Sequence, residues 1–282
     1  MGRSAKIGII QVVADYSWSP DECVSHMLDL VEECLKEKAD IVTVPEWYQY
    51  KSNEAGNVEG SKSYIRGNLE RSSYLAKKYG AYVATWDIEH AADGKAYNAS
   101  FIFGRDGAEV GRYRKVHPTS SEIKYGISAG DDYHVFDLDF AKTGVMICYD
   151  NRFPESAGIL TRKGAEIILY PLYGEWEDMI PGDSWEVSLR ARAIDNEVYI
   201  VPCQLKNRIK NKRTAFSGIV TPGGYLLKVL EEPGSIAVVD INLDKIDDNF
   251  VNRGRNNIRE TREALLNARN IPAYHSLTEK RK

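Results

Sequence analysis

The stretch TGVMICYDNRFPE, residues 143–155, sets the organisation of this sequence. Its apolar run from Val145 to Ile147 is typical of a buried strand, and a helical pattern with proline at its first position begins at Pro154. Cys148 therefore lies where a strand ends and a helix approaches. At such a junction a thiol can project from the edge of a sheet while the backbone N–H of Tyr149 points at a bound anion.

A lone cysteine at the end of a strand is more often a small apolar core residue than a nucleophile. Two further motifs in the sequence favour the nucleophile. The motif DIVTVPEW, residues 40–47, is a β-branched run that ends in Pro45 and Glu46. The motif RYRKVHPTSSE, residues 112–122, places Lys115 and Glu122 where a strand passes into a loop. Because α/β proteins present their chemistry at the carboxyl ends of strands, the three motifs together favour one site.

In this order, the motifs VPE, RKVHPTSSE and CYDNRFPE resemble the nitrilase superfamily of carbon–nitrogen hydrolases, whose catalytic residues are Glu, Lys and Cys. The resemblance continues through residues 184–201 and 216–224, and so covers residues 6 to about 240. It implies a cysteine-dependent hydrolase of non-peptide carbon–nitrogen bonds, with neither a metal nor an organic cofactor.

The resemblance also assigns roles to particular residues. Glu46 is expected to act as the general base that takes the thiol proton of Cys148, which then attacks an amide carbon and forms a thioester. The ammonium of Lys115 and the backbone N–H of Tyr149 are expected to bind the oxyanion, and Glu122 to orient Lys115 and keep it charged. Lys115 and the N-terminus of the helix that follows Cys148 are also expected to lower the pKa of Cys148, leaving it partly as thiolate.

Three arginines fit positions of the same family. Arg152, Arg190 and Arg192 are interpreted as structural residues that form ion pairs rather than as catalysts.

The residues after the cysteine bear on the substrate. Tyr149-Asp150 looks like the amidase and carbamoyl-hydrolase branches, whereas a Trp-Glu pair is typical of true nitrilases. A small amide is therefore the expected substrate, with an N-carbamoyl compound as the alternative and a nitrile third. Specificity is expected from the loops 47–56, 120–130 and 170–183, the last of which is acidic and aromatic and would suit an amine-bearing substrate or simply be exposed.

Two other interpretations of the site are a papain-like enzyme and a non-catalytic relative. A papain-like Cys-His pair could use His90, His117, His134 or His275 as its base. Of these only His117 lies near a motif, and no papain-type signature surrounds Cys148. A non-catalytic binding or scaffold relative would be expected to lack one of the three catalytic residues. This sequence has all three.

Composition limits the remaining classes. The 282 residues contain no linker-like segment, are 43% hydrophobic and carry a net charge of −4, which predicts one domain and no nucleic-acid partner. No stretch approaches the ~20 apolar residues that cross a bilayer, so no membrane partner and a cytoplasmic location are expected. The four cysteines show neither CxxC pairs nor metal-ligand spacing.

The order of expected elements is β-α-β-α-β up to residue 86, followed by hairpins around Asp106-Gly107, strands that alternate with two helices, and three final strands. The first strand is expected from Lys6 to Val13, and the capping box Ser19-Pro20-Asp21-Glu22 begins the first helix. The second of the two later helices is expected from about residue 184 to residue 196. The family resemblance implies that they form a four-layer α-β-β-α sandwich with two stacked mixed sheets. The residues from about 244 form a polar C-terminal extension with a helix expected near 258–268. Such tails dock on neighbouring subunits in the family, which implies a homodimer or higher homo-oligomer, although the tail could also fray.

Overall fold

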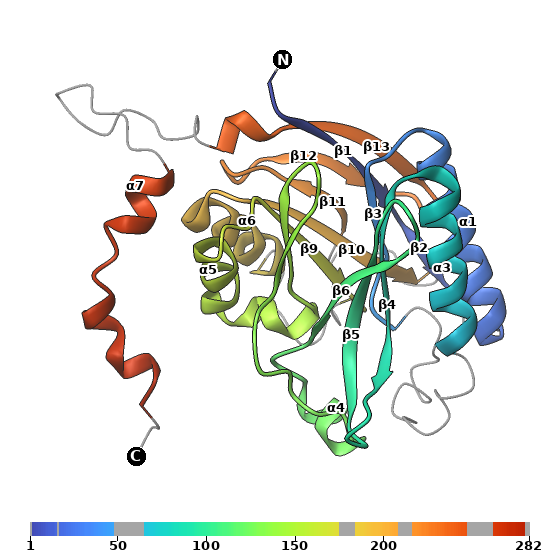
Figure 1. Cartoon of the computed structure of the whole chain (residues 1–282), viewed down its shortest axis with the longest axis horizontal. Helices are drawn as coiled ribbons and strands as arrows, with labels where there is room; N and C mark the ends of the chain where they lie inside the picture. Colours follow the sequence, from blue (N-terminus) through green and yellow to red (C-terminus); the bar gives the residue numbers. More distant parts are fainter. Residues whose placement is uncertain are drawn as a thin grey trace.

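The computed structural model describes residues 2–15, 17–47, 65–174, 184–207, 216–246 and 262–279. In these ranges two β-sheets lie face to face, and helices cover the outer face of each (Figure 1). Helices α1 (Pro20–Lys36) and α3 (Ile65–Tyr79) cover one sheet, and α5 (Pro154–Arg162) and α6 (Ser184–Asn196) cover the other. The predicted four-layer α-β-β-α sandwich is confirmed.

Both sheets mix parallel and antiparallel strands. The first has the order β13 (Ile236–Asn242), β1 (Ser4–Ile10), β3 (Ile41–Thr43), β4 (Tyr82–His90), β5 (Ala96–Phe103) and β6 (Glu109–Arg114), with β1, β3 and β4 parallel. The second has the order β12 (Leu226–Leu230), β11 (Ser217–Val220), β10 (Tyr199–Asn207), β9 (Ile167–Leu172), β8 (Lys142–Val145) and β7 (Val135–Asp137), with β8, β9 and β10 parallel.

The N-terminal segment contributes to both sheets. The sequence predicted a single strand from Lys6 to Val13, but the structure divides it at Gln11 into β1 and β2 (Val12–Ala14), and β2 pairs with β10 of the second sheet. The buried side chain of Gln11 donates to the carbonyl of Gln204 (3.0 Å) and accepts from the N–H of Ser217 (3.3 Å). These hydrogen bonds tie the two sheets together where the strand changes partner.

Helix α1 begins as its sequence predicts. The Ser19 hydroxyl accepts from the backbone N–H of Glu22, the Glu22 carboxylate accepts from the N–H of Ser19, and Pro20 occupies the first turn. This capping box satisfies N–H groups that have no partner inside the helix. Apolar side chains on one face, including Met27 and Val31, are fully buried against the first sheet.

The connections after three strands bring the motif residues to the same end of the two sheets. Glu46 follows β3, Lys115 follows β6, and Cys148 lies three residues beyond β8. The predicted hairpin of β5 and β6 is present, and beyond its last register pair Lys115 still donates its N–H to the carbonyl of Asn98 (2.8 Å). Lys115 is thereby held beside β5.

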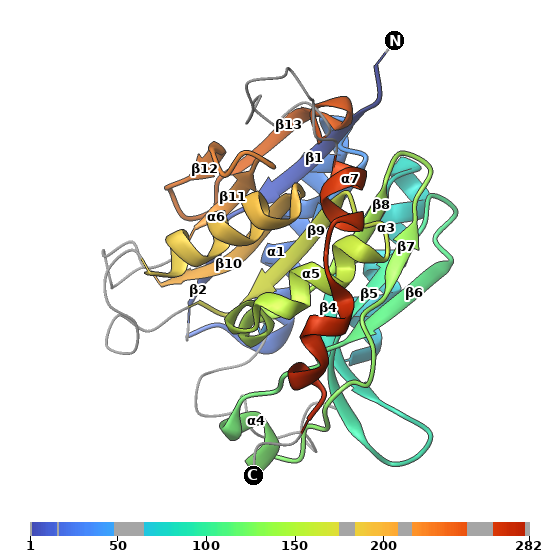
Figure 2. The ribbon, with the colours of Figure 1, turned by 90° about the vertical axis from the view of Figure 1, so that its left-hand side faces the viewer.

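The C-terminal residues run along the helices of the second sheet (Figure 2). Helix α7 (Arg262–Asn267) accepts a hydrogen bond from Arg162 of α5 at the Leu266 carbonyl (3.5 Å), and Arg269 donates to the Asn196 side chain (3.1 Å) before the 3₁₀ segment η3 (Ile271–Leu277). The first residues of the helix predicted near 258–268 lie outside the described ranges. Within the described ranges, no helix is both long and apolar enough to cross a membrane.

Candidate active site

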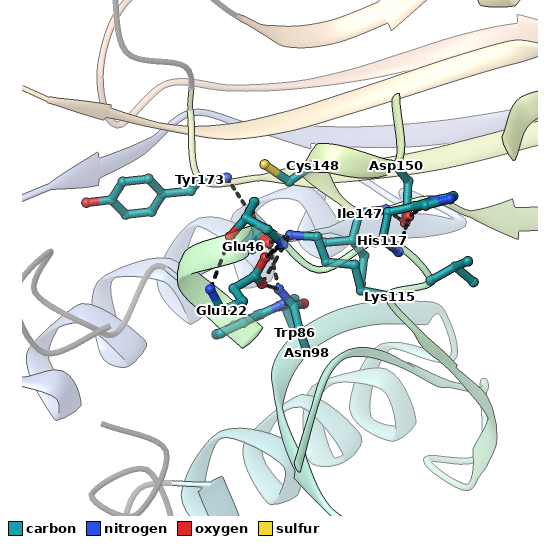
Figure 3. A network of polar contacts seen from close by, with 12 residues as sticks. Glu46, Trp86, Asn98, Lys115, His117, Glu122, Ile147, Cys148, Asp150 and Tyr173 are labelled. Carbon is teal, nitrogen blue, oxygen red and sulfur yellow. Dashed lines mark hydrogen bonds and ion pairs between the residues drawn. The ribbon is translucent and has the colours of Figure 1, made fainter. Parts of the chain in front are cut away.

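Four side chains predicted from the motifs converge between the sheets (Figure 3). The Nζ of Lys115 lies 2.8 Å from Oε1 of Glu46 and 2.9 Å from Oε2 of Glu122, and Cys148 lies beside them. The Lys115 and Glu46 side chains are each 1% exposed. An ammonium shared by two carboxylates in a buried site interacts strongly with both, because the protein interior screens their charges less than water does.

Glu46 has hydrogen bonds to both of its carboxylate oxygens. Oε1 accepts from Lys115 Nζ (2.8 Å) and from Asn98 Nδ2 (2.7 Å), and Oε2 accepts from the backbone N–H of Tyr173 (3.0 Å). Burial raises the pKa of Glu46, Lys115 opposes this, and the negative charge of Glu122 adds to the rise. A carboxylate whose pKa is raised above its usual value is suited to accept and return a proton.

Glu122 lies on a short helix where the sequence predicted a loop. In α4 (Ser120–Lys124) the Thr119 hydroxyl accepts from the Glu122 N–H, while the Glu122 carboxylate accepts from the Thr119 N–H (2.7 Å). The T-x-x-E pattern of a capping box was visible in the sequence and marks this helix. Burial alone would raise the pKa of Glu122, but Lys115 and the Thr119 N–H hold it below its usual range. The two carboxylates on Lys115 therefore differ in acidity.

Lys115 is held as an ammonium. Its burial favours the neutral amine, but the charges of Glu46 and Glu122 outweigh that effect and raise its pKa above the usual range. The lysine consequently supplies a fixed positive charge rather than a proton.

Cys148 lies in a left-handed backbone conformation, with φ of 43°. It begins a 3₁₀ turn, η1 (Cys148–Arg152), which the sequence did not predict, whereas the helix that starts at Pro154 is confirmed. The carbonyl of Cys148 accepts from the Tyr170 hydroxyl (2.9 Å), and the Asp150 carboxylate accepts from the Ile147 N–H (2.8 Å). A non-glycine residue in this region is strained and persists only where its surroundings hold it, as they do here.

The structure corrects the prediction that Cys148 rests partly as a thiolate. Burial raises the pKa of Cys148 well above its usual value, Glu46 and Glu122 raise it further, and Lys115 offsets only part of the rise. The prediction of a resting thiolate was wrong because it counted the ammonium and omitted burial and the net negative charge of the cluster. The resting thiol is protonated, so it must lose its proton as it attacks.

His117 belongs to a separate network. Its Nδ1 lies 3.0 Å from Oδ1 of Asp150, and its ring stacks on Phe153 at 3.7 Å between centroids. Asp150 is fully buried and also accepts from the Tyr113 hydroxyl (2.7 Å) and from the His117 N–H (3.0 Å). His117 therefore joins the loop after Lys115 to the turn that begins at Cys148. Its ring pairs with Asp150, and not with the Cys148 thiol as a papain-like site would require.

The family arginines make different contacts. Arg190 pairs with Glu186 at 3.5 Å, whereas Arg192 donates to the backbone carbonyl of Asn151 at 3.3 Å, and Arg152 is exposed. Asn98 is the residue that sequence reasoning missed, although a polar side chain inside an apolar strand was a signal. Among the residues that the structure describes, no cluster of three or more His, Cys, Asp or Glu side chains is arranged to hold a metal ion.

Thiol labelling is expected to single out Cys148. Cys34 and Cys203 are buried with raised pKa values, about 12 for Cys34, while Cys148 and Cys23 are half-buried. Iodoacetamide is itself an amide, and at Cys148 the Glu46 carboxylate can take the thiol proton. Brief treatment followed by peptide mapping should label Cys148 first, faster as pH rises, with loss of activity in proportion. Labelling of Cys23 with Cys148 unmodified would contradict the assignment.

Comparison with known proteins agrees with this geometry. The model of a family described as carbon–nitrogen hydrolase matches residues 6–248. An omega-amidase from Xenopus tropicalis is 30% identical over 233 residues, which cover 79% of this chain and 84% of the relative. The structure is similar to that of a carbon–nitrogen hydrolase from Helicobacter pylori G27, with a TM-score of 0.83, 23% identity and 99% coverage of both chains. An amidase from Nesterenkonia sp. has a TM-score of 0.78 at 18% identity and covers 98% of this chain and 97% of its own.

Proposed function

The chain belongs to the carbon–nitrogen hydrolase family of the nitrilase superfamily and is a cysteine-dependent amide hydrolase, and we propose that Cys148, Glu46, Lys115 and Glu122 form its catalytic site. The observation that carries the proposal is the buried Lys115 ammonium, which two carboxylates share at 2.8 and 2.9 Å beside Cys148. Such an arrangement is costly to bury. It gives the site a permanent positive charge on Lys115 and a carboxylate, Glu46, that can take up and release a proton.

In the first half-reaction, Glu46 takes the thiol proton as the Cys148 sulfur forms a bond to the amide carbon. The negative charge that develops on the substrate oxygen meets the Lys115 ammonium and the backbone N–H of Tyr149, the second residue of the turn η1, where N–H groups lack partners within the turn. The carbon–nitrogen bond then breaks as Glu46 gives its proton to the departing nitrogen. Ammonia leaves, and the acyl group remains on sulfur as a thioester.

In the second half-reaction, Glu46 removes a proton from water as the water oxygen attacks the thioester carbon. The same two donors bind the second oxyanion, the carbon–sulfur bond breaks, and Glu46 returns the proton to sulfur. The carboxylic acid is released and the thiol is restored. Glu122 keeps Lys115 charged and in place through both steps, since it holds the ammonium by two contacts of 2.9 and 3.1 Å.

We propose a small substrate with a terminal amide, the class that the name of the Xenopus relative indicates for that protein. We expect ammonia release from small primary amides to exceed release from ureido acids and nitriles by at least about tenfold. Carbon dioxide should be measured in parallel, because hydrolysis of a carbamoyl group releases it and hydrolysis of an amide does not. Cys148→Ala is the blank. Ammonia accompanied by carbon dioxide from ureido acids alone would overturn the assignment.

For the whole chain, we propose one carbon–nitrogen hydrolase domain over residues 1–282, with a C-terminal extension from about 244, in a cytoplasmic homodimer or higher homo-oligomer. The free thiols of Cys34, Cys148 and Cys203 support a reducing compartment. Exposed apolar side chains on the C-terminal segment, Ile271 at 46% and Leu277 at 63%, support a neighbouring subunit as the surface that covers them.

A further inference from the structure

Asn98 contacts both carboxylates of the site. It is the third residue of β5, is fully buried, and directs Nδ2 at Oε1 of Glu46 (2.7 Å) and at Oε1 of Glu122 (2.5 Å) (Figure 3). A side-chain amide has two N–H groups, so each carboxylate receives one. Lys115 bonds the same two groups, and Asn98 therefore provides a second, uncharged bridge between them.

Trp86 fixes which way the amide points. Its Nε1 lies 2.6 Å from Oδ1 of Asn98, and an indole N–H can only donate, so the atom facing Trp86 must be the amide oxygen. Trp86 pairs with Ser100 in the β4–β5 register, which places Asn98 diagonally opposite on the same face. Trp86 is fully buried and packs on Trp47, next to Glu46, at 4.8 Å between ring centroids. A turned amide would place its NH₂ against the Trp86 N–H and its oxygen against the two carboxylates, so the hydrogen bonds fix this orientation.

We propose that Asn98, held in one orientation by Trp86, is a positioning residue that keeps Glu46 and Glu122 ionised and correctly placed around Lys115. The proposal rests on the proposed catalytic role of Glu46. One ammonium cannot neutralise two carboxylates, and hydrogen bonds to charged groups in a dry site are strong. Without the two N–H groups of Asn98, the uncompensated negative charge would favour protonation of one carboxylate.

The expected pH effect has a definite sign. The groups that face Glu46 are Lys115 after β6, Glu122 of α4 and Cys148 of η1, and the hydrogen bonds from Asn98 lower the pKa of both glutamates. Loss of Asn98 therefore raises the pKa of Glu46. Because the base must be ionised to take the thiol proton, the acid limb of the kcat/KM profile should move to higher pH.

The test compares three single variants of Asn98 and Trp86 with one double variant. Asn98→Ala should lower kcat by about 10- to 100-fold with little change in KM and shift the acid limb upward by about one pH unit. Asn98→Asp, which has the same shape but places a third carboxylate in the cluster, should shift it further. Trp86→Phe, which frees the amide to turn over, should produce a smaller shift in the same direction. In an Asn98→Ala background, Trp86→Phe should add no further shift, because Trp86 acts through Asn98.

A matched control and a readout without substrate separate this role from mere stability. Asn196 is also a buried asparagine, but its amide donates to the carbonyl of Arg192 at the end of α6 (2.9 Å), so Asn196→Ala should leave the acid limb unchanged. The Glu46 carboxyl can be titrated by ¹³C NMR in glutamate-labelled enzyme and assigned with Glu46→Gln. An unshifted Glu46 titration in Asn98→Asp would overturn the proposal even if Glu46 proved not to be the base. A shifted titration without loss of turnover would instead refute the catalytic role of Glu46.

Discussion

Cys148→Ala is expected to abolish amide hydrolysis and to leave the fold almost unchanged. Loss of the nucleophile removes the thioester route altogether, and in covalent hydrolases such losses amount to about a millionfold in kcat. The residue is half-buried at the start of the turn η1, and alanine carries the same backbone strain at φ of 43° as cysteine does. The free energy of unfolding should therefore change by less than about 1 kcal/mol.

Ammonia release and thermal melting measure the two halves of this prediction. Cys23→Ala is the matched control, because Cys23 is also half-buried but lies on α1, away from the site, and this variant should keep full activity. A Cys148→Ala enzyme that still releases ammonia would exclude cysteine catalysis at this position. A variant that melts many degrees lower would instead identify Cys148 as a structural core residue.

The parts of the fold that the sequence predicted are those with local causes. The capping box of Ser19 and Glu22 starts α1 as expected, and helix α6 has the predicted bounds of residues 184–196. The turn η1 could not be predicted because distant partners hold it, with Tyr170 from β9 bonded to the Cys148 carbonyl. The break of the first strand at Gln11 likewise depends on Gln204 and Ser217 in the second sheet.

The residues of the site also divide into those that a local sequence pattern marks and those that depend on distant parts of the chain. Glu46 and Cys148 stand at the ends of apolar runs, and Lys115 stands at the end of an expected strand, where a sequence pattern can mark them. Asn98 stands inside a strand, and its importance arises only because hairpin register and loop closure bring both glutamates to it. The pKa of Cys148 depends on burial and on the summed charge of three neighbours, neither of which is visible in a motif.

Glu46→Gln is expected to separate proton transfer from charge. Glutamine keeps nearly the shape of glutamate and can accept from Lys115 and Asn98, but it cannot carry the thiol proton. General acid–base catalysis typically contributes about 10²- to 10⁴-fold to the rate. Because Glu46 serves both half-reactions, turnover should fall by about 10⁴-fold or more. One hydrogen bond is lost, since the glutamine NH₂ would face the Tyr173 N–H, which costs stability by about 1 kcal/mol.

The same substitution should make Cys148 more acidic. Glu46 raises the pKa of the thiol by its negative charge, whereas Lys115 lowers it, so removal of the Glu46 charge leaves the ammonium opposed only by Glu122. The thiolate fraction at neutral pH then rises, and the pH profile of Cys148 alkylation moves to lower pH. The variant should thus combine a more reactive cysteine with an almost inactive enzyme, an outcome that a simple loss of folding cannot produce.

Glu122→Gln is the matched control for this pair of effects. Glu122 also raises the pKa of Cys148 by its charge, so both variants should move the alkylation profile in the same direction. Only Glu46→Gln removes the proton carrier, and turnover should therefore fall much further in Glu46→Gln than in Glu122→Gln. Equal losses of turnover would assign the base to the carboxylate pair as a unit, and an alkylation profile displaced to higher pH in Glu46→Gln would place the Glu46 charge away from the sulfur.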